Sequence, residues 1–166
     1  MTCMNRRRFL LLASLLPAVS ACAPGGGTGF GEFGSGNADT VLDVARRNGS
    51  GTFGSLAERA GLAERLGGSG PFTIFAPTDA AFRAAGLRRS DEEELRRIIG
   101  YHIVPGQIGS SFMEGLEMNH LTASGATLSI DGRGDVIRVN DSRVLRTDLV
   151  AGNGVVHIID RVLRPE

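Results

Sequence analysis

The feature of this sequence that most constrains its fold is a change of pattern near Gly115. Before that residue, apolar side chains recur at helical spacing, as at Phe53 and Leu56. After it, short apolar runs are separated by turn sequences, of which residues 131–134 and residues 153–154 are the clearest. Helices followed by hairpins, in place of regularly alternating strands and helices, predict an α+β domain.

Local signals place the individual elements. Asp39 or Thr40 is suited to cap the first helix and Thr78 a later one, and the sequence from Ser90 to Glu93 has the form of a capping box. Helices are expected within residues 41–45, 53–66, 79–85 and 91–99. A short extended piece is expected at residues 101–106, and strands are expected at residues 72–76, 116–121, 127–130, 136–139, 143–145 and 155–162.

Residues 1–21 have the form of an export signal. Three consecutive arginines begin at Arg6, a short apolar run follows, and small residues precede Cys22. The arginines with the following Phe9 and Leu10 resemble the twin-arginine signature, and the stretch ending at Cys22 resembles a bacterial lipobox. We therefore expect cleavage before Cys22 and lipidation of its side chain. An ordinary free thiol at Cys22 is the alternative.

Residues 22–38 predict a flexible, lipid-anchored tether, with the folded domain in residues 39–166. The segment is rich in glycine and has few residues able to form a core. Residues 29–34 match the GxGxxG pattern of dinucleotide sites, but no strand precedes them and no helix follows, so the match reflects composition. Phe30 and Phe33 in this segment have no assigned role.

The composition argues against several classes of function. Net charge is zero, every basic residue is arginine, and Tyr101 is the sole tyrosine in a chain without tryptophan, so nucleic-acid binding is not expected. The three histidines lack zinc-ligand spacing. No GxSxG, HExxH or P-loop sequence is present. We expect no enzyme activity, no cofactor and no metal.

Three segments, taken in order, resemble the motifs of the fasciclin domain family. They are residues 73–82 (TIFAPTDAAF), residues 101–106 (YHIVPG) and residues 153–160 (NGVVHIID). The resemblance covers nearly the whole folded part and implies a β-sandwich-like core of short strands with helices packed against it. It also implies a secreted or membrane-anchored protein with a role in adhesion. Arg164 and Val156 depart modestly from the pattern, which has an apolar residue and isoleucine there.

The residues of these motifs have structural and functional interpretations. His157 lies in a run that is apolar on both faces, which predicts a central strand and a core histidine bonded to the backbone. A binding surface, or catalysis, is the alternative for His157. His102, beside a helix end, is suited to satisfy loose backbone groups. The resemblance nevertheless makes Tyr101, His102, Asn153, His157 and Asp160 the candidate binding residues.

Other polar residues receive simpler interpretations. Asp79 is suited to the first turn of a helix and Asp160 to a strand end, while His120 is expected to be partly exposed. The acids and arginines of residues 88–97 predict a solvated helix face. Residues 133–135 spell the Arg-Gly-Asp tripeptide known from integrin recognition, but they fall on a predicted turn, which favours Gly and Asp anyway.

These observations predict a non-enzymatic, exported lipoprotein with a single fasciclin-like domain that mediates adhesion or protein–protein contact. It would sit on the periplasmic face of a membrane, on the outer membrane or at the cell surface. Its expected partners are the membrane, through the lipid, and an unknown protein, with a monomeric head. The alternatives are an envelope signalling or maintenance protein with one specific partner and, after that, a small-ligand binder or enzyme.

Overall fold

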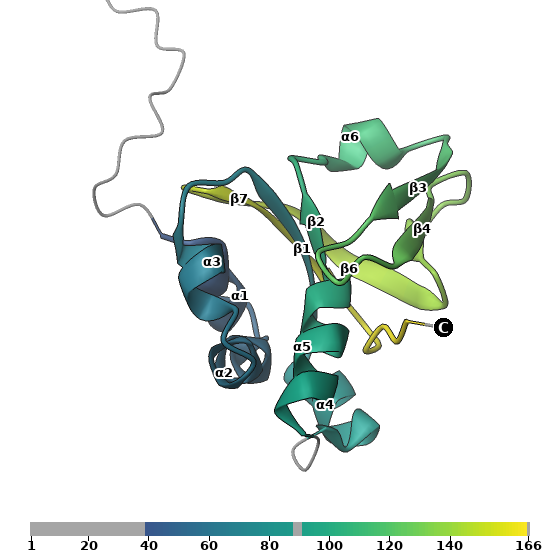
Figure 1. Ribbon diagram of the computed structural model, residues 1–166. Coiled ribbons are helices and arrows are strands. Elements are labelled where there is room, and N and C mark those ends of the chain that lie inside the picture. Colours follow the sequence, from purple (N-terminus) through teal and green to yellow (C-terminus); the bar gives the residue numbers. More distant parts are fainter. Residues whose placement is uncertain (1–38, 88–90, 166) are drawn as a thin grey trace, which may run out of the picture. The chain divides into compact units, whose positions relative to one another are not determined.

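The computed structural model describes residues 39–87 and 91–165 (Figure 1). The predicted export signal, the lipidation site at Cys22, the tether with Phe30 and Phe33, and the predicted cap at Ser90 lie outside these residues and stay predictions.

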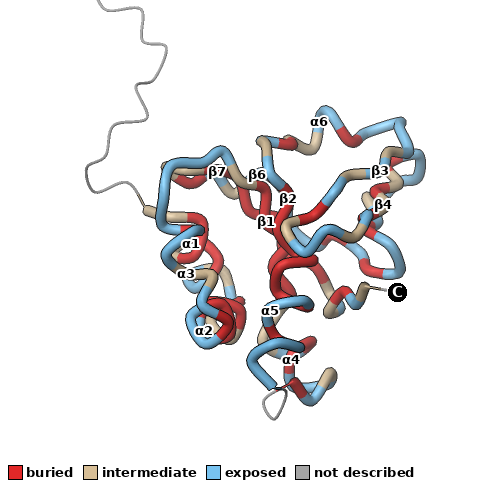
Figure 2. The backbone as a smooth tube through the Cα atoms, in the orientation of Figure 1, coloured by how far each residue is buried: buried red, intermediate tan, exposed pale blue. Residues whose placement is uncertain are grey.

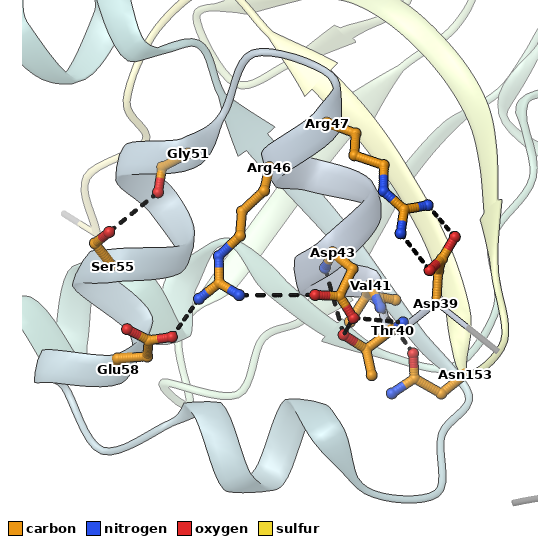
Figure 3. Close-up of polar contacts among 10 residues, drawn as sticks. All are labelled: Asp39, Thr40, Val41, Asp43, Arg46, Arg47, Gly51, Ser55, Glu58 and Asn153. Carbon is orange, nitrogen blue, oxygen red and sulfur yellow. Dashed lines mark hydrogen bonds and ion pairs between the residues drawn. The ribbon is translucent and has the colours of Figure 1, made fainter. Parts of the chain in front are cut away.

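Helices make up most of the described chain before β2. Thr40 caps α1 as part of a capping box with Asp43 (Figure 3). The hydroxyl of Thr78 accepts a hydrogen bond from the backbone of Ala81 at the start of α4. Both caps were expected from the sequence. The helices are α1 (Val41–Arg47), α2 (Gly51–Arg59), α3 (Ala63–Gly67), α4 (Asp79–Ala85), α5 (Glu92–Tyr101) and α6 (Ser110–Met113).

The strands form one mixed sheet in the order β2-β1-β7-β6-β5-β4-β3. Only β1 and β7 pair in parallel; the other neighbours are antiparallel. The long strand β6 pairs with β5 near its start and with β7 over the rest, so it joins two halves of the sheet. The strands are β1 (Phe72–Pro77), β2 (Ile103–Pro105), β3 (Glu117–Leu121), β4 (Thr127–Asp131), β5 (Arg138–Val139), β6 (Ser142–Ala151) and β7 (Gly154–Ile159).

Strands β1 and β7 separate two hydrophobic clusters. On one side, Ile74 and Val156 pack in a cluster with side chains of α1, α2 and α5. On the other side, Phe75 and Ile159 pack in a second cluster with side chains of β4, such as Leu128. Figure 1 shows α1 to α3 on one side of these strands and β3 and β4 on the other, and Figure 2 shows the buried residues concentrated between them. The α+β class and the sandwich-like core with packed helices are thereby confirmed.

Three predicted boundaries were wrong. The helix expected over residues 53–66 is two helices, because the chain turns at Gly61, whose φ of +68° suits glycine. The extended piece expected at residues 101–106 is a strand over Ile103–Pro105 only, since Tyr101 is the last residue of α5. The strand expected at residues 143–145 extends over Ser142–Ala151, since β6 continues through two irregularities in its register with β7.

Candidate functional site

His102 follows the last residue of α5 and is fully buried. The backbone N–H of Leu163 donates to its Nε2 at 2.9 Å, so the ring proton is on Nδ1, which donates to the carbonyl of Ile98 at 2.7 Å. Burial lowers the pKa of His102 to about 4, against the opposing effect of the bond to Ile98. The imidazole is therefore neutral and joins the helix end to the C-terminal segment.

Tyr101 is also buried, and its hydroxyl connects α5 to the second half of the sheet. The hydroxyl donates to the carbonyl of Thr127 at 2.8 Å and accepts a bond from the amide of Asn140 at 2.9 Å. Asn140 lies between β5 and β6 with a φ of +50°. Tyr101 therefore stabilises the packing of the hairpin on the helix.

His157 is fully buried in the centre of β7, as the sequence predicted for a core histidine. Its Nδ1 accepts a hydrogen bond from the backbone N–H of Asp148 at 3.3 Å, so Nε2 carries the proton and donates to the carbonyl of Ile108 at 2.8 Å. The ring stacks on Phe75 at 5.4 Å between centroids. Burial lowers the pKa of His157, although the bond to Ile108 and the charge of Asp148 act in the opposite direction.

Asn153 and Asp160 are partly exposed and hold the two ends of β7. The amide of Asn153 donates to the carbonyls of Leu66 at 2.6 Å and Gly68 at 3.0 Å, and its oxygen accepts from the N–H of Val41 at 2.9 Å. Figure 3 shows this contact with the start of α1. The carboxylate of Asp160 accepts from the backbone of Arg143 at 2.8 Å, as expected for a strand end.

The five candidate binding residues therefore share a structural role. The side chains of Tyr101, His102 and His157 are buried and have no direct access to a partner, while Asn153 and Asp160 are bonded to the backbone of neighbouring elements. Binding by these residues remains a prediction. Within the structure, these five residues can influence binding only indirectly, by holding in place the segments that form a surface.

His157 fixes one such surface through Asp148 and Ser110. Asp148 has a φ of +55°, and its carboxylate accepts bonds from the backbone N–H of Ser110 at 2.8 Å and from the Ser110 hydroxyl. Burial on its own would raise the pKa of Asp148, but the bonds from Ser110 and the neighbouring His157 hold it below its usual value. The left-handed backbone at Asp148 falls within the register irregularity of β6 between Arg146 and Leu149, and Asp148 is bonded to both Ser110 and His157.

A groove with a volume of about 550 Å³ lies against this corner. Ser110 and Thr147, the residue before Asp148, both line it. The rest of the lining comes from the end of α6, the loop between β4 and β5, and β6: Glu114, Gly115, Gly132, Arg133, Gly134, Asp135, Val136, Ile137 and Val144. Through Asp148 and Ser110, the buried histidine thus positions part of the wall of this groove.

The guanidinium of Arg133 is engaged within the domain. It contacts the carboxylate of Asp131 at 3.0 Å and that of Glu117 at 2.7 Å. The hydrogen bond from Arg133 lowers the pKa of Asp131. Arg133 is therefore not presented freely, which argues against integrin-type recognition of residues 133–135.

Neither a group of metal-ligating side chains nor a membrane-spanning helix is found in the described part of the chain. No three His, Cys, Asp or Glu side chains there are placed to hold a metal ion. Among the same residues, no helix has the length and hydropathy needed to cross a bilayer.

Comparison with known proteins assigns the domain. The model of the family described as "Fasciclin domain" matches residues 48–165. The chain belongs to the fasciclin family. This is a family of adhesion and surface proteins, among which the solved FAS1 domain pair of the insect cell adhesion molecule fasciclin I has the same fold, with a TM-score of 0.59 and 23% sequence identity. That match covers 70% of this chain and 46% of the solved chain.

Fasciclin relatives occur in bacteria and animals. The chain is 37% identical over 140 residues to protein sll1483 of Synechocystis, which covers 78% of this chain and 75% of the relative. It is 35% identical to the cell surface glycolipoprotein MPB83 of Mycobacterium bovis, covering 68% of this chain and 51% of MPB83. Periostin of Homo sapiens is 34% identical over 69% of this chain, but this chain spans only 14% of periostin.

The fasciclin motifs contain the buried residues Tyr101, His102 and His157, but nothing in the sequence predicted the groove. Its lining residues, which include the apolar Val136, Ile137 and Val144 beside small and polar ones, come from three separate elements with no shared spacing. Asp148 gave no signal in the sequence, because it lies beyond the strand expected at residues 143–145. Its left-handed conformation became visible only with its bonds to Ser110 and His157.

Proposed function

We propose that this fasciclin protein is an exported contact module, anchored by lipid at Cys22, which attaches a cell surface or envelope to another protein without chemical catalysis. The groove beside Ser110 and Thr147 is its contact surface. Cell-surface or periplasmic location follows from the same proposal.

The observation that carries the proposal is that the two histidines of the motifs are fully engaged inside the fold. Both nitrogens of His102 and of His157 bond to backbone groups, and burial keeps both rings neutral. A general base needs access to a substrate proton, which neither ring has. The two histidines therefore stabilise the fold, and recognition of a partner falls to the exposed surface.

The relatives support the same kind of role. MPB83 is described as a cell surface glycolipoprotein, and fasciclin I as a cell adhesion molecule. The export signature and the cysteine at residue 22 are consistent with a lipid-bearing cell surface protein, as MPB83 is described. Mass spectrometry of the mature protein from membranes should find an N-terminal diacylglyceryl cysteine at residue 22. An unmodified Cys22 behind an intact leader would remove the anchor from the proposal.

Photocrosslinking in the producing cells tests the contact surface. A photoreactive amino acid placed at Val136, in the groove lining, should yield crosslinked products, whereas the same group at the exposed Val150 should not. Several products would indicate adhesion, and one dominant product would indicate a single envelope partner. Equal crosslinking from both positions, or none from Val136, would contradict the groove as contact surface.

A further inference from the structure

We infer that the groove takes an extended peptide segment in which a basic side chain lies between apolar ones. This inference rests on the proposed function, because it names the chemistry of the partner at the same surface.

Apolar side chains form part of the groove lining. Among the described residues, the large apolar side chains that remain exposed are Phe112 (61%), Leu116 (52%), Leu121 (64%), Val136 (46%), Leu145 (56%) and Val150 (73%). Of these, Val136 lines the groove, together with the less exposed Ile137 and Val144. Single exposed apolar residues are ordinary, but an apolar wall in a concave site provides contacts for apolar side chains of a partner.

The charge of the groove selects among partners. Its lining contains the carboxylates of Glu114 and Asp135 and one cation, Arg133. Arg133 is already paired with Asp131 and Glu117, and no ion pair to Glu114 or Asp135 is formed within residues 39–87 and 91–165. The two remaining carboxylates favour a cationic group and disfavour phosphate-bearing partners.

The walls of the groove are fixed before any partner binds. The N–H of Gly115 donates to the carbonyl of Gly132 at 2.7 Å, and the N–H of Gly132 donates to the carbonyl of Leu116 at 2.8 Å. A Cβ at Gly132 would stand 1.9 Å from the carbonyl oxygen of Met113, so the two walls meet too closely for any other residue. A preformed site loses less conformational entropy on binding, and a volume of about 550 Å³ suits a few peptide residues.

Fluorescence anisotropy with three labelled peptides tests the inference on the full chain. The probes are Ser-Leu-Arg-Leu-Ser and the same peptide with Gln or Glu in place of Arg. The arginine peptide should bind about tenfold more tightly than the glutamate peptide, and this preference should shrink as the salt concentration rises. Replacing the two carboxylates, by Glu114→Gln with Asp135→Asn, should weaken the arginine peptide about fivefold and remove its advantage over the glutamine peptide.

Matched variants separate the effect of the groove residues from the general effect of losing surface charge or apolar surface. Glu92→Gln with Glu93→Gln removes two exposed carboxylates on α5 and should leave all three affinities unchanged. Val136→Ser should weaken all three peptides, whereas Val150→Ser, at an exposed position of β6 outside the lining, should not. Equal affinity for the three peptides, no binding of any, or equal effects of the groove and α5 variants would overturn the inference.

A second copy of the chain is the rival occupant. Sedimentation that shows a dimer dissociated by Val136→Ser would overturn the peptide proposal in favour of self-association. If crosslinking from Val136 succeeds while the peptides fail, only the partner chemistry is wrong. If crosslinking from Val136 fails, the proposed function is wrong whatever the peptides do.

Discussion

Replacement of His157 by phenylalanine isolates the hydrogen bonds of the buried ring. Phenylalanine keeps a ring of similar size to stack on Phe75, so little cavity is created. The change leaves the carbonyl of Ile108 and the N–H of Asp148 without their partner. A buried group without its partner costs about 1–3 kcal/mol. Ile108 is buried, and Asp148 is exposed enough for water to replace its bond, so we expect a loss of about 2–3 kcal/mol.

Urea unfolding followed by circular dichroism measures this loss. The midpoint should fall while the slope with denaturant stays the same, because the folded state remains compact. His157→Ala should lose more than His157→Phe, since it adds a cavity. The control is His120→Phe, at a partly exposed position, which should change stability by less than about 0.5 kcal/mol. A His157→Phe protein as stable as the unmodified chain would refute the argument that His157 stabilises the fold through its hydrogen bonds to the backbone.

Three further outcomes follow from the same contacts. Burial holds the pKa of His102 near 4, against 6.5 when exposed, so a stabilisation of about 3 kcal/mol from the neutral ring is complete above pH 6.5 and is lost as the pH falls toward 4. The free energy of unfolding measured at pH 7 and pH 5 should show this loss, and His102→Gln should reduce the difference between the two pH values. Asn153→Ala removes three bonds to the backbone and should lower the free energy of unfolding by about 2–3 kcal/mol in urea titrations; a loss below about 0.5 kcal/mol would contradict it. Gly154→Ala would place a Cβ 2.0 Å from the carbonyl oxygen of Phe72, so its melting temperature should fall well below that of Gly49→Ala, where the space around the Cβ is open and only the positive φ acts.

The sequence predicted most of the fold because its signals are local and strong. Thr40 and Thr78 are capping residues in front of apolar repeats, and the run around His157 is apolar on both faces, which only a central strand satisfies. The break at Gly61 was missed because the apolar spacing continues through it. The length of β6 was missed because its bulges, near Thr147, disturb the alternation that marks a strand.

The candidate site was harder to predict than the fold. The motifs correctly indicated Tyr101, His102 and His157 as special positions, but a motif does not reveal whether a side chain faces solvent. Their burial and the tautomers of the rings depend on partners far away in the chain, such as Leu163 for His102. The groove arises from α6, one loop and β6 meeting in space, which only the tertiary structure shows.

Attachment measured with matched surface variants tests the proposed contact function most directly. Protein immobilised through its N-terminal segment should retain cells or envelope fragments, and the Val136→Ser protein should lose most of that retention at unchanged unfolding midpoint. Val150→Ser should retain as much as the unmodified chain. Equal retention by all three proteins would contradict the account.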